Sequence, residues 1–237
     1  MGSAVGNMND IVYILKNGID PEELRYSVRS VVKNFPYRKI WFYGGLPEGI
    51  RPDKMVRVEQ TGETKWEKVA GTLRMVCEND EITEDFWLFN DDFFIMKKTE
   101  DFPVAVRGTL KDRVEGIAHK HGYLTKYGLQ LKATEEILKE NGFGTLDYTL
   151  HVPILVNRKI AIECLGAFPG CPMFRSLYGN YAEIGGITMQ DVKITAPEAA
   201  PTGEEQMLST SDRSWKDGKV GEYIREQFKE PCKYERA

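Results

Sequence analysis

The chain has 237 residues, of which 41% are hydrophobic and 11% aromatic, and its formal net charge is −4. This apolar content is enough to build a folded core, so an intrinsically disordered protein is excluded. The acidic balance argues against a protein that binds nucleic acid over a broad basic surface. The length suits one large domain, and we expect a single domain over residues 1–237.

Cysteine spacing and hydropathy limit the class further. The four cysteines show no CxxC spacing, which argues against a zinc site or a redox motif. No segment approaches the run of about 20 apolar residues that a membrane span needs. The first ten residues lack the apolar core of a signal peptide. We therefore expect a cytoplasmic protein whose residues 1–8 are an unstructured or tag-derived N-terminus.

The predicted elements of the first half alternate between strand and helix. Asp10–Gly18 ("DIVYILKNG") is an apolar, β-branched run that ends in Asn-Gly, which is typical of a buried strand entering a turn. The next segment predicts a helix that Asp20 caps and Pro36 ends. Further strands are expected over 39–45, 54–60 and 85–97, and a second helix over 64–80. This alternation predicts an α/β fold with parallel strands.

The strand expected over 85–97 passes through two adjacent carboxylates, Asp91 and Asp92. Two like charges within an apolar strand are costly unless something cationic accompanies them. In an α/β sheet, ligands bind at the carboxyl ends of the strands, and Mg²⁺ or Mn²⁺ shares one or two carboxylates with substrate phosphates. A metal–diphosphate site and a solvated acidic turn are both consistent with the pair.

The second half is less regular. A helix is expected from residue 124 up to Gly142, followed by a short extended piece and another helix within 148–168. His119 and His121 are expected in a solvated loop. Residues 194–206 are rich in Pro, Ala and Glu and predict an exposed loop, and 217–228 predict a final helix.

Several stretches occur in an order that resembles the Stealth family. They are "NDIVYILKNG", "ELRYSVRSVVKNFPYRKIWFYGG", "FWLFNDDFFIM", "LHVPILVNRKIAIECLGAFPGCPMFRSLY" and "LSTSDRSWKDGKVGEYIREQFKEPCKYE". The family includes bacterial capsular-polysaccharide sugar-phosphate transferases and the catalytic subunit of N-acetylglucosamine-1-phosphotransferase. "ELRYSVRS" and "LFNDDFF" are its most specific matches here, and the last block is its weakest.

The resemblance implies a GT-A-like α/β catalytic domain, with a mixed, mainly parallel sheet flanked by helices. It implies a donor UDP-sugar, Mg²⁺ or Mn²⁺, and an acceptor hydroxyl on a glycan. The expected reaction transfers sugar-1-phosphate and releases UMP. A plain GT-A glycosyltransferase, which releases UDP, and a non-catalytic module that binds nucleotide sugars or glycans are the alternatives.

The resemblance also assigns candidate site residues. Asp91 and Asp92 match the family's acidic pair, with Asp92 the first candidate for the metal–diphosphate. His151, in "HVP", matches the catalytic histidine, and an imidazole suits a general base that takes the acceptor's proton. Arg175, in "FRSLY", matches an arginine that meets the diphosphate, for which a guanidinium is well shaped. Asp212, in "TSD", is a candidate second metal or acceptor contact.

Asp10 and Arg29 are weaker candidates for contacts with the nucleotide. Each assignment has a purely structural alternative. His151 is then a satisfied structural histidine, Arg175 a surface ion-pair residue and Asp212 the cap of a turn or helix.

Overall fold

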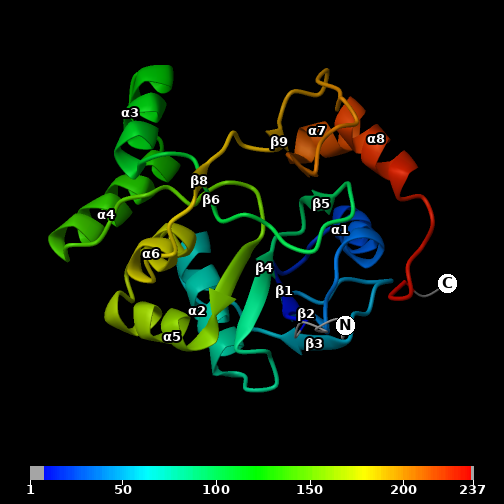
Figure 1. Ribbon diagram of the computed structural model, residues 1–237, viewed down its shortest axis with the longest axis horizontal. Coiled ribbons are helices and arrows are strands. Elements are labelled where there is room, and N and C mark those ends of the chain that lie inside the picture. Colours follow the sequence, from blue (N-terminus) through cyan, green and yellow to red (C-terminus); the bar gives the residue numbers. More distant parts are fainter. Residues whose placement is uncertain (1–7, 236–237) are drawn as a thin grey trace, which may run out of the picture.

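The computed structural model describes residues 8–235, and a five-stranded sheet lies at its centre (Figure 1). The strand order is β3-β2-β1-β4-β7. These strands are β1 (Asp10–Leu15), β2 (Ile40–Gly44), β3 (Lys54–Arg57), β4 (Asp85–Phe89) and β7 (Ile154–Asn157). All neighbours are parallel except β4 and β7, which are antiparallel. The prediction of an α/β fold around a mixed, mainly parallel sheet is confirmed.

Helices cover both faces of this sheet. On one face, α1 (Pro21–Asn34) buries Leu24, Val28 and Val31 against the side chains of β1 and β2. Asp20 caps α1 as expected, since its side chain accepts a hydrogen bond from the amide of Glu22. On the other face lie α2 (Lys65–Glu78), α5 (Arg158–Ala167) and α6 (Phe174–Tyr181). The sheet is therefore sandwiched, and its strand ends are the places open to a ligand.

The remaining elements lie beyond the carboxyl ends of the parallel strands. Helices α3 (Leu110–His121) and α4 (Lys126–Glu140) pack together on one side, as Figure 1 shows, and α7 (Asp212–Asp217) and α8 (Lys219–Gln227) lie on the other. A second sheet has the order β5-β10-β9, and a third pairs β6 with β8. Their strands are β5 (Phe93–Ile95), β6 (Ala105–Val106), β8 (Ile187–Thr188), β9 (Lys193–Ile194) and β10 (Met207–Thr210).

The prediction of one continuous strand over 85–97 is wrong. β4 ends at Phe89, the chain turns at Asn90–Asp92, and β5 joins the second sheet, antiparallel to β10. The turn removes the two carboxylates from the middle of a buried strand, where they would cost most. Asp91 and Asp92 consequently stand just past the carboxyl end of a central strand.

Two further predictions differ from the structure in part. His119 and His121 are exposed as expected, but they occupy the last turn of α3 rather than a loop. The predicted loop over 194–206 differs at its first residue, because Ile194 belongs to β9, and residues 195–206 connect β9 to β10 without a helix or strand. The prediction for residues 1–8 falls almost entirely outside the described residues. Within residues 8–235, no helix combines the length and the apolar character needed to cross a membrane.

Asp10 organises the amino end of the sheet. Its side chain is fully buried and accepts hydrogen bonds from Arg38, the Trp41 indole and the amide of Thr83. These partners come from the segment before β2, from β2 itself and from the segment before β4. The carboxylate therefore fastens three neighbouring segments at one point.

Replacing Asp10 with alanine is expected to destabilise the protein by about 3 kcal/mol, because the Arg38 guanidinium and the Trp41 indole lose their buried acceptor. Urea unfolding measures this change. Glu81→Ala is the matched control, since Glu81 pairs with Lys54 on the surface, and it is expected to change the free energy of unfolding much less than Asp10→Ala. Equal effects of the two substitutions would contradict a structural role for Asp10.

Candidate active site

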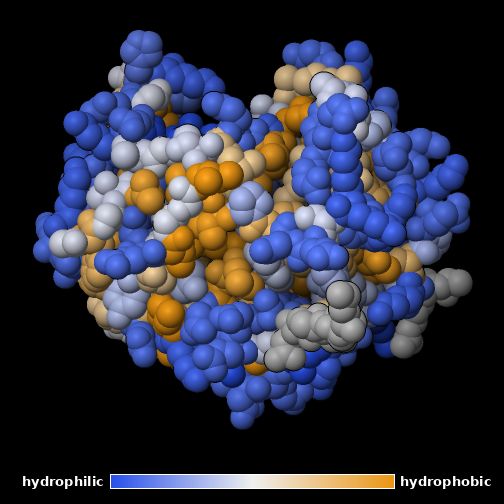
Figure 2. Space-filling view, in the orientation of Figure 1, coloured by the Kyte–Doolittle hydropathy of each residue, from blue (hydrophilic) through white to orange (hydrophobic). Residues whose placement is uncertain are grey.

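A cavity of about 410 Å³ opens at the carboxyl ends of β1 and β4. Its floor includes Ile14 and Leu88 from these strands, and its walls come from α2, α3, α4 and α6. The cavity thus occupies the position where α/β sheets bind ligands. On the face drawn in Figure 2, hydrophobic residues also gather in an indentation between the part that holds α3 and α4 and the part that holds α7 and α8.

The charged side chains that line this cavity are all basic. They are Lys65, Arg107, Arg113 and Arg175, and His151 lies among them. In residues 8–235, no carboxylate lies within ion-pair distance of Lys65, Arg113 or Arg175. Although the protein is acidic overall, three cationic side chains of this cavity have no ion-pair partner among the described residues. A cavity of this kind suits an anionic ligand.

Arg175 lies in the first turn of α6 and lines the cavity. It donates a hydrogen bond to the carbonyl of Val152 and stands over the Phe93 ring at 5.8 Å. Burial lowers the pKa of Arg175 to about 10, although the charges of Asp92 and Asp191 oppose this shift. Arg175 is therefore not a surface ion-pair residue. A buried guanidinium without a carboxylate partner is costly, and phosphate oxygens would offset that cost.

His151 reaches the cavity from the segment that precedes β7. Its Nδ1 lies 2.8 Å from an oxygen of Asp191, and its backbone amide donates to the other oxygen of the same carboxylate at 3.1 Å. Asp191 therefore fixes both the backbone and the ring of His151. In a neutral ring, this carboxylate favours the tautomer with hydrogen on Nδ1, which leaves Nε2 able to accept a proton.

Asp191 is a site residue that sequence reasoning missed. It follows the β8 strand in an irregular stretch and belongs to none of the recognisable motifs, so no local pattern identifies it. Arg107 is its second partner, and Arg107 in turn lies 3.9 Å from the buried carboxylate of Asp147. Burial tends to raise the pKa of Asp191, but the hydrogen bonds from His151 and Arg107 hold it well below its usual range.

The acidic pair lies beside this arrangement, and a lysine accompanies it. Lys193 donates to one oxygen of Asp92 at 2.9 Å, and Ser209 donates to the same oxygen at 3.0 Å. The other oxygen of Asp92 is buried and has no hydrogen-bond partner in residues 8–235. Burial, together with the charge of Asp92, raises the pKa of Asp91 to about 6. The cation that the sequence pattern calls for is thus partly supplied by the protein.

Two further carboxylates stand near the acidic pair. Glu23, in the first turn of α1, accepts a hydrogen bond from the Thr210 hydroxyl. Burial, together with the charges of Asp91, Asp92 and Asp212, raises the pKa of Glu23 to about 8, although the hydrogen bond from Thr210 opposes this shift. Asp212 itself is exposed at the start of α7, where Ser211, not Asp212, is the N-cap. Sequence reasoning treats Glu23 only as a first-turn acid of its helix.

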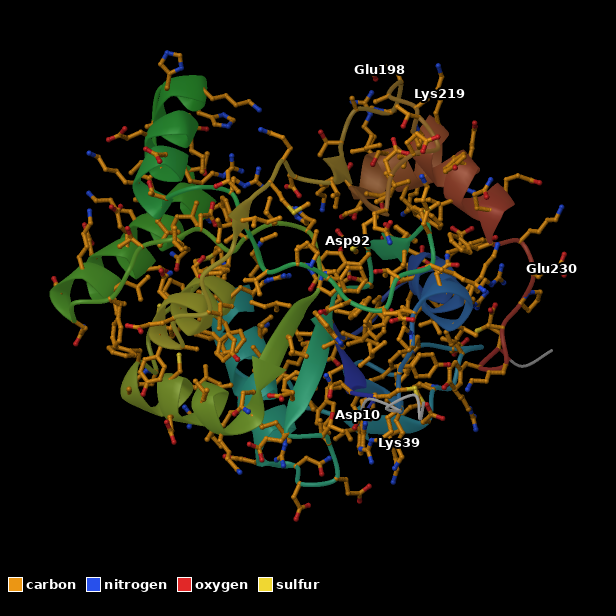
Figure 3. The ribbon with its side chains drawn as sticks, viewed as in Figure 1. Asp10, Lys39, Asp92, Glu198, Lys219 and Glu230 are labelled. Atoms are coloured by element: carbon orange, nitrogen blue, oxygen red, sulfur yellow. The ribbon has the colours of Figure 1, made fainter. Side chains whose placement is uncertain are left out.

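The structure brings His151, Arg175, Asp91 and Asp92 to one edge of the sheet, but not Asp10 or Arg29. Asp10 forms structural hydrogen bonds at the amino end of β1, and Figure 3 shows it well away from Asp92. Arg29 forms a two-pronged ion pair with Glu235 and donates to the carbonyl of Phe228, which fastens the C-terminal segment to α1. The structure therefore gives these two residues structural contacts in place of the nucleotide contacts that the sequence predicts.

Comparisons with known proteins give only distant matches. No family model and no curated protein matches the chain. An active-site mutant of LgtC aligns with a TM-score of 0.46 and 12% identity, over 92% of this chain and 94% of LgtC. The galactosyltransferase LgtC in complex with donor and acceptor sugar analogs aligns with a TM-score of 0.44 and 12% identity, over 94% and 96% of the two chains. These values are too low to support an argument about activity, and the resemblance to the Stealth family stays a prediction.

The contact between His151 and Asp191 predicts which tautomer the His151 ring adopts. In nitrogen–proton correlation spectra recorded where the histidine rings are neutral, His151 is expected to carry its hydrogen on Nδ1. Asp191→Ala is expected to shift this population towards Nε2–H, because the acceptor of Nδ1–H is lost. The chain has only three histidines, and the exposed His119 and His121 serve as internal references. An unchanged tautomer in the variant would contradict the assignment.

The raised pKa of Glu23 predicts how the stability of the protein depends on pH. Its pKa in the folded protein is about 8, against 4.5 as the ordinary value, so the folded state holds a proton that the unfolded chain releases. The resulting stabilisation is complete below about pH 4.5 and is lost as the pH rises through 8. Glu23→Gln keeps the acceptor for Thr210 and cannot ionise.

Urea unfolding between pH 5 and pH 9 is therefore expected to show the wild type losing stability relative to Glu23→Gln as the pH rises. Glu198→Gln, in the exposed loop between β9 and β10, controls for the loss of one carboxylate. A difference between wild type and Glu23→Gln that does not vary with pH would count against the shifted pKa.

Proposed function

We propose that the protein is a nucleotide-sugar-dependent transferase that moves sugar-1-phosphate from a UDP-sugar to a hydroxyl of a glycan acceptor. The observation that carries this proposal is the basic cavity itself. Lys65, Arg113 and Arg175 line it without a carboxylate partner in the described part of the chain, and a histidine held by an aspartate lies in its wall. A diphosphate supplies the negative charge that this arrangement lacks.

In this reaction, His151 is the general base. Its Nε2 takes the proton of the acceptor hydroxyl as the hydroxyl oxygen bonds to the sugar-proximal phosphorus. The bond from that phosphorus to the bridging oxygen of the diphosphate breaks, and UMP leaves with the electron pair. Asp191 holds the imidazole in position and stabilises the imidazolium as it forms. Arg175 and the other cations of the cavity balance the charge on the phosphate oxygens.

The acidic pair fits a divalent cation shared with the donor. Mg²⁺ and Mn²⁺ commonly take one or two protein carboxylates and complete their coordination with substrate phosphates and water. Asp91 and Asp92 offer such a pair, including the buried Asp92 oxygen without a partner. In the described part of the chain, no group of three His, Cys, Asp or Glu side chains is arranged to hold a metal alone. A bound cation would supply further positive charge to the diphosphate.

Arg175 lies at the junction of the two parts of the site. The charges of both Asp92 and Asp191 act on its guanidinium. On this ground we assign the acidic pair, the arginine and the His151–Asp191 pair to one site, in which donor phosphates and an acceptor hydroxyl would meet. Asp212 is exposed at the start of α7, and we retain it as a candidate acceptor contact.

The nucleotide that is released tests the reaction. A panel of UDP-sugars with Mg²⁺ or Mn²⁺ and glycan acceptors is expected to yield UMP. Release of UDP would instead indicate plain glycosyl transfer, and binding of the donor without release of either nucleotide would indicate a binding module.

His151→Ala is expected to lower the turnover number about 10²- to 10⁴-fold, since the general base is lost, while UDP binding measured by calorimetry changes little. His119→Ala, on the exposed end of α3, is the matched control and is expected to retain full turnover. Full activity in His151→Ala would remove His151 from the mechanism.

A further inference from the structure

Lys193 is built into the site by the pairing of two strands. In the parallel register of β9 and β10, Lys193 stands directly opposite Ser209. Neighbouring positions of paired strands direct their side chains to the same face. Both side chains accordingly reach the same oxygen of Asp92, at 2.9 and 3.0 Å.

This ion pair is mostly shielded from water. The Lys193 side chain is 22% exposed and that of Asp92 is 15% exposed. The ammonium is therefore a substantial partner of Asp92, not a weak surface contact. It also acts on the neighbouring carboxylate, because the charges of Lys16 and Lys193 both lower the pKa of Asp91 against the effects of burial and of Asp92. Lys193 thus balances part of the negative charge of the pair through a direct ion pair with Asp92.

We propose that Lys193 is a built-in counter-ion that competes with the divalent cation for Asp92. This inference rests on the proposed function, in which the acidic pair shares a metal with the donor diphosphate. A divalent cation at Asp92 and the ammonium of Lys193 repel each other, so Lys193 has to release the carboxylate when the metal binds. Its flexible four-carbon stem permits this movement.

One consequence concerns the order of binding. Without a nucleotide, the metal gains only the two carboxylates and has to displace Lys193. With a diphosphate present, phosphate oxygens add ligands to the metal and also offer the displaced ammonium a new anionic partner. Lys193 therefore makes metal binding depend on the donor, and the acidic pair holds the metal weakly until the substrate arrives.

Mn²⁺ binding to the whole protein, followed by electron paramagnetic resonance without nucleotide, tests this role directly. Lys193→Met keeps much of the side-chain volume and removes the charge. It is expected to bind Mn²⁺ at least about tenfold more tightly than the wild type, because a repelling charge next to the metal is lost. Asp92→Asn combined with Lys193→Met is expected to abolish this gain.

Lys97→Met is the matched control. Lys97 forms an exposed ion pair with Glu204, so its loss changes the net charge equally without touching the acidic pair. Equal Mn²⁺ affinity in the wild type, Lys193→Met and Lys97→Met would overturn the proposal, and so would undetectable binding in all three.

A gain in Lys193→Met that persists when Asp92 is replaced would also overturn the proposal, because the gained site would then lie elsewhere. UDP binding, measured separately, reports on the basic cavity. A failure of Lys193 as a counter-ion is thereby distinguished from a failure of the proposed function.

Discussion

The proposed chemistry depends on the contacts that the carboxylate of Asp191 makes with His151. It holds both the amide and the ring of His151, and it lies two residues before Lys193, which holds Asp92. One short segment, Asp191–Lys193, therefore positions the base of the site and balances its acidic pair. Displacing this segment would disturb both groups at once, although they come from distant parts of the chain.

The local elements and the edge of the sheet that carries the site could be predicted from sequence. The Asp20 cap, Pro36 and the apolar spacing between them fix α1, because capping and periodicity are local properties. The strand–helix alternation likewise gives the mainly parallel sheet. The apolar run before Asp91 and Asp92 also predicts a strand that leads up to the pair, but its local pattern does not show that the strand ends there.

The contacts that complete the site could not be predicted, because they join segments far apart in the sequence. Lys193 meets Asp92 across 101 positions, and Asp191 meets His151 across 40. Neither Asp191 nor Lys193 belongs to a motif with a spacing that points to a partner. The structural roles of Asp10 and Arg29 could not be predicted either. A charged residue at the start of a strand or on a helix has the same local sequence pattern whether it binds a ligand or stabilises the fold.

The central claim is that the basic cavity binds the diphosphate of a nucleotide. Calorimetric titration of the protein with UDP and with uridine tests it most directly. UDP is expected to bind at least about tenfold more tightly than uridine, and Arg113→Met is expected to remove much of that difference, since charged hydrogen bonds to phosphate are lost. Equal affinity for UDP and uridine, or no binding of either, would contradict the account.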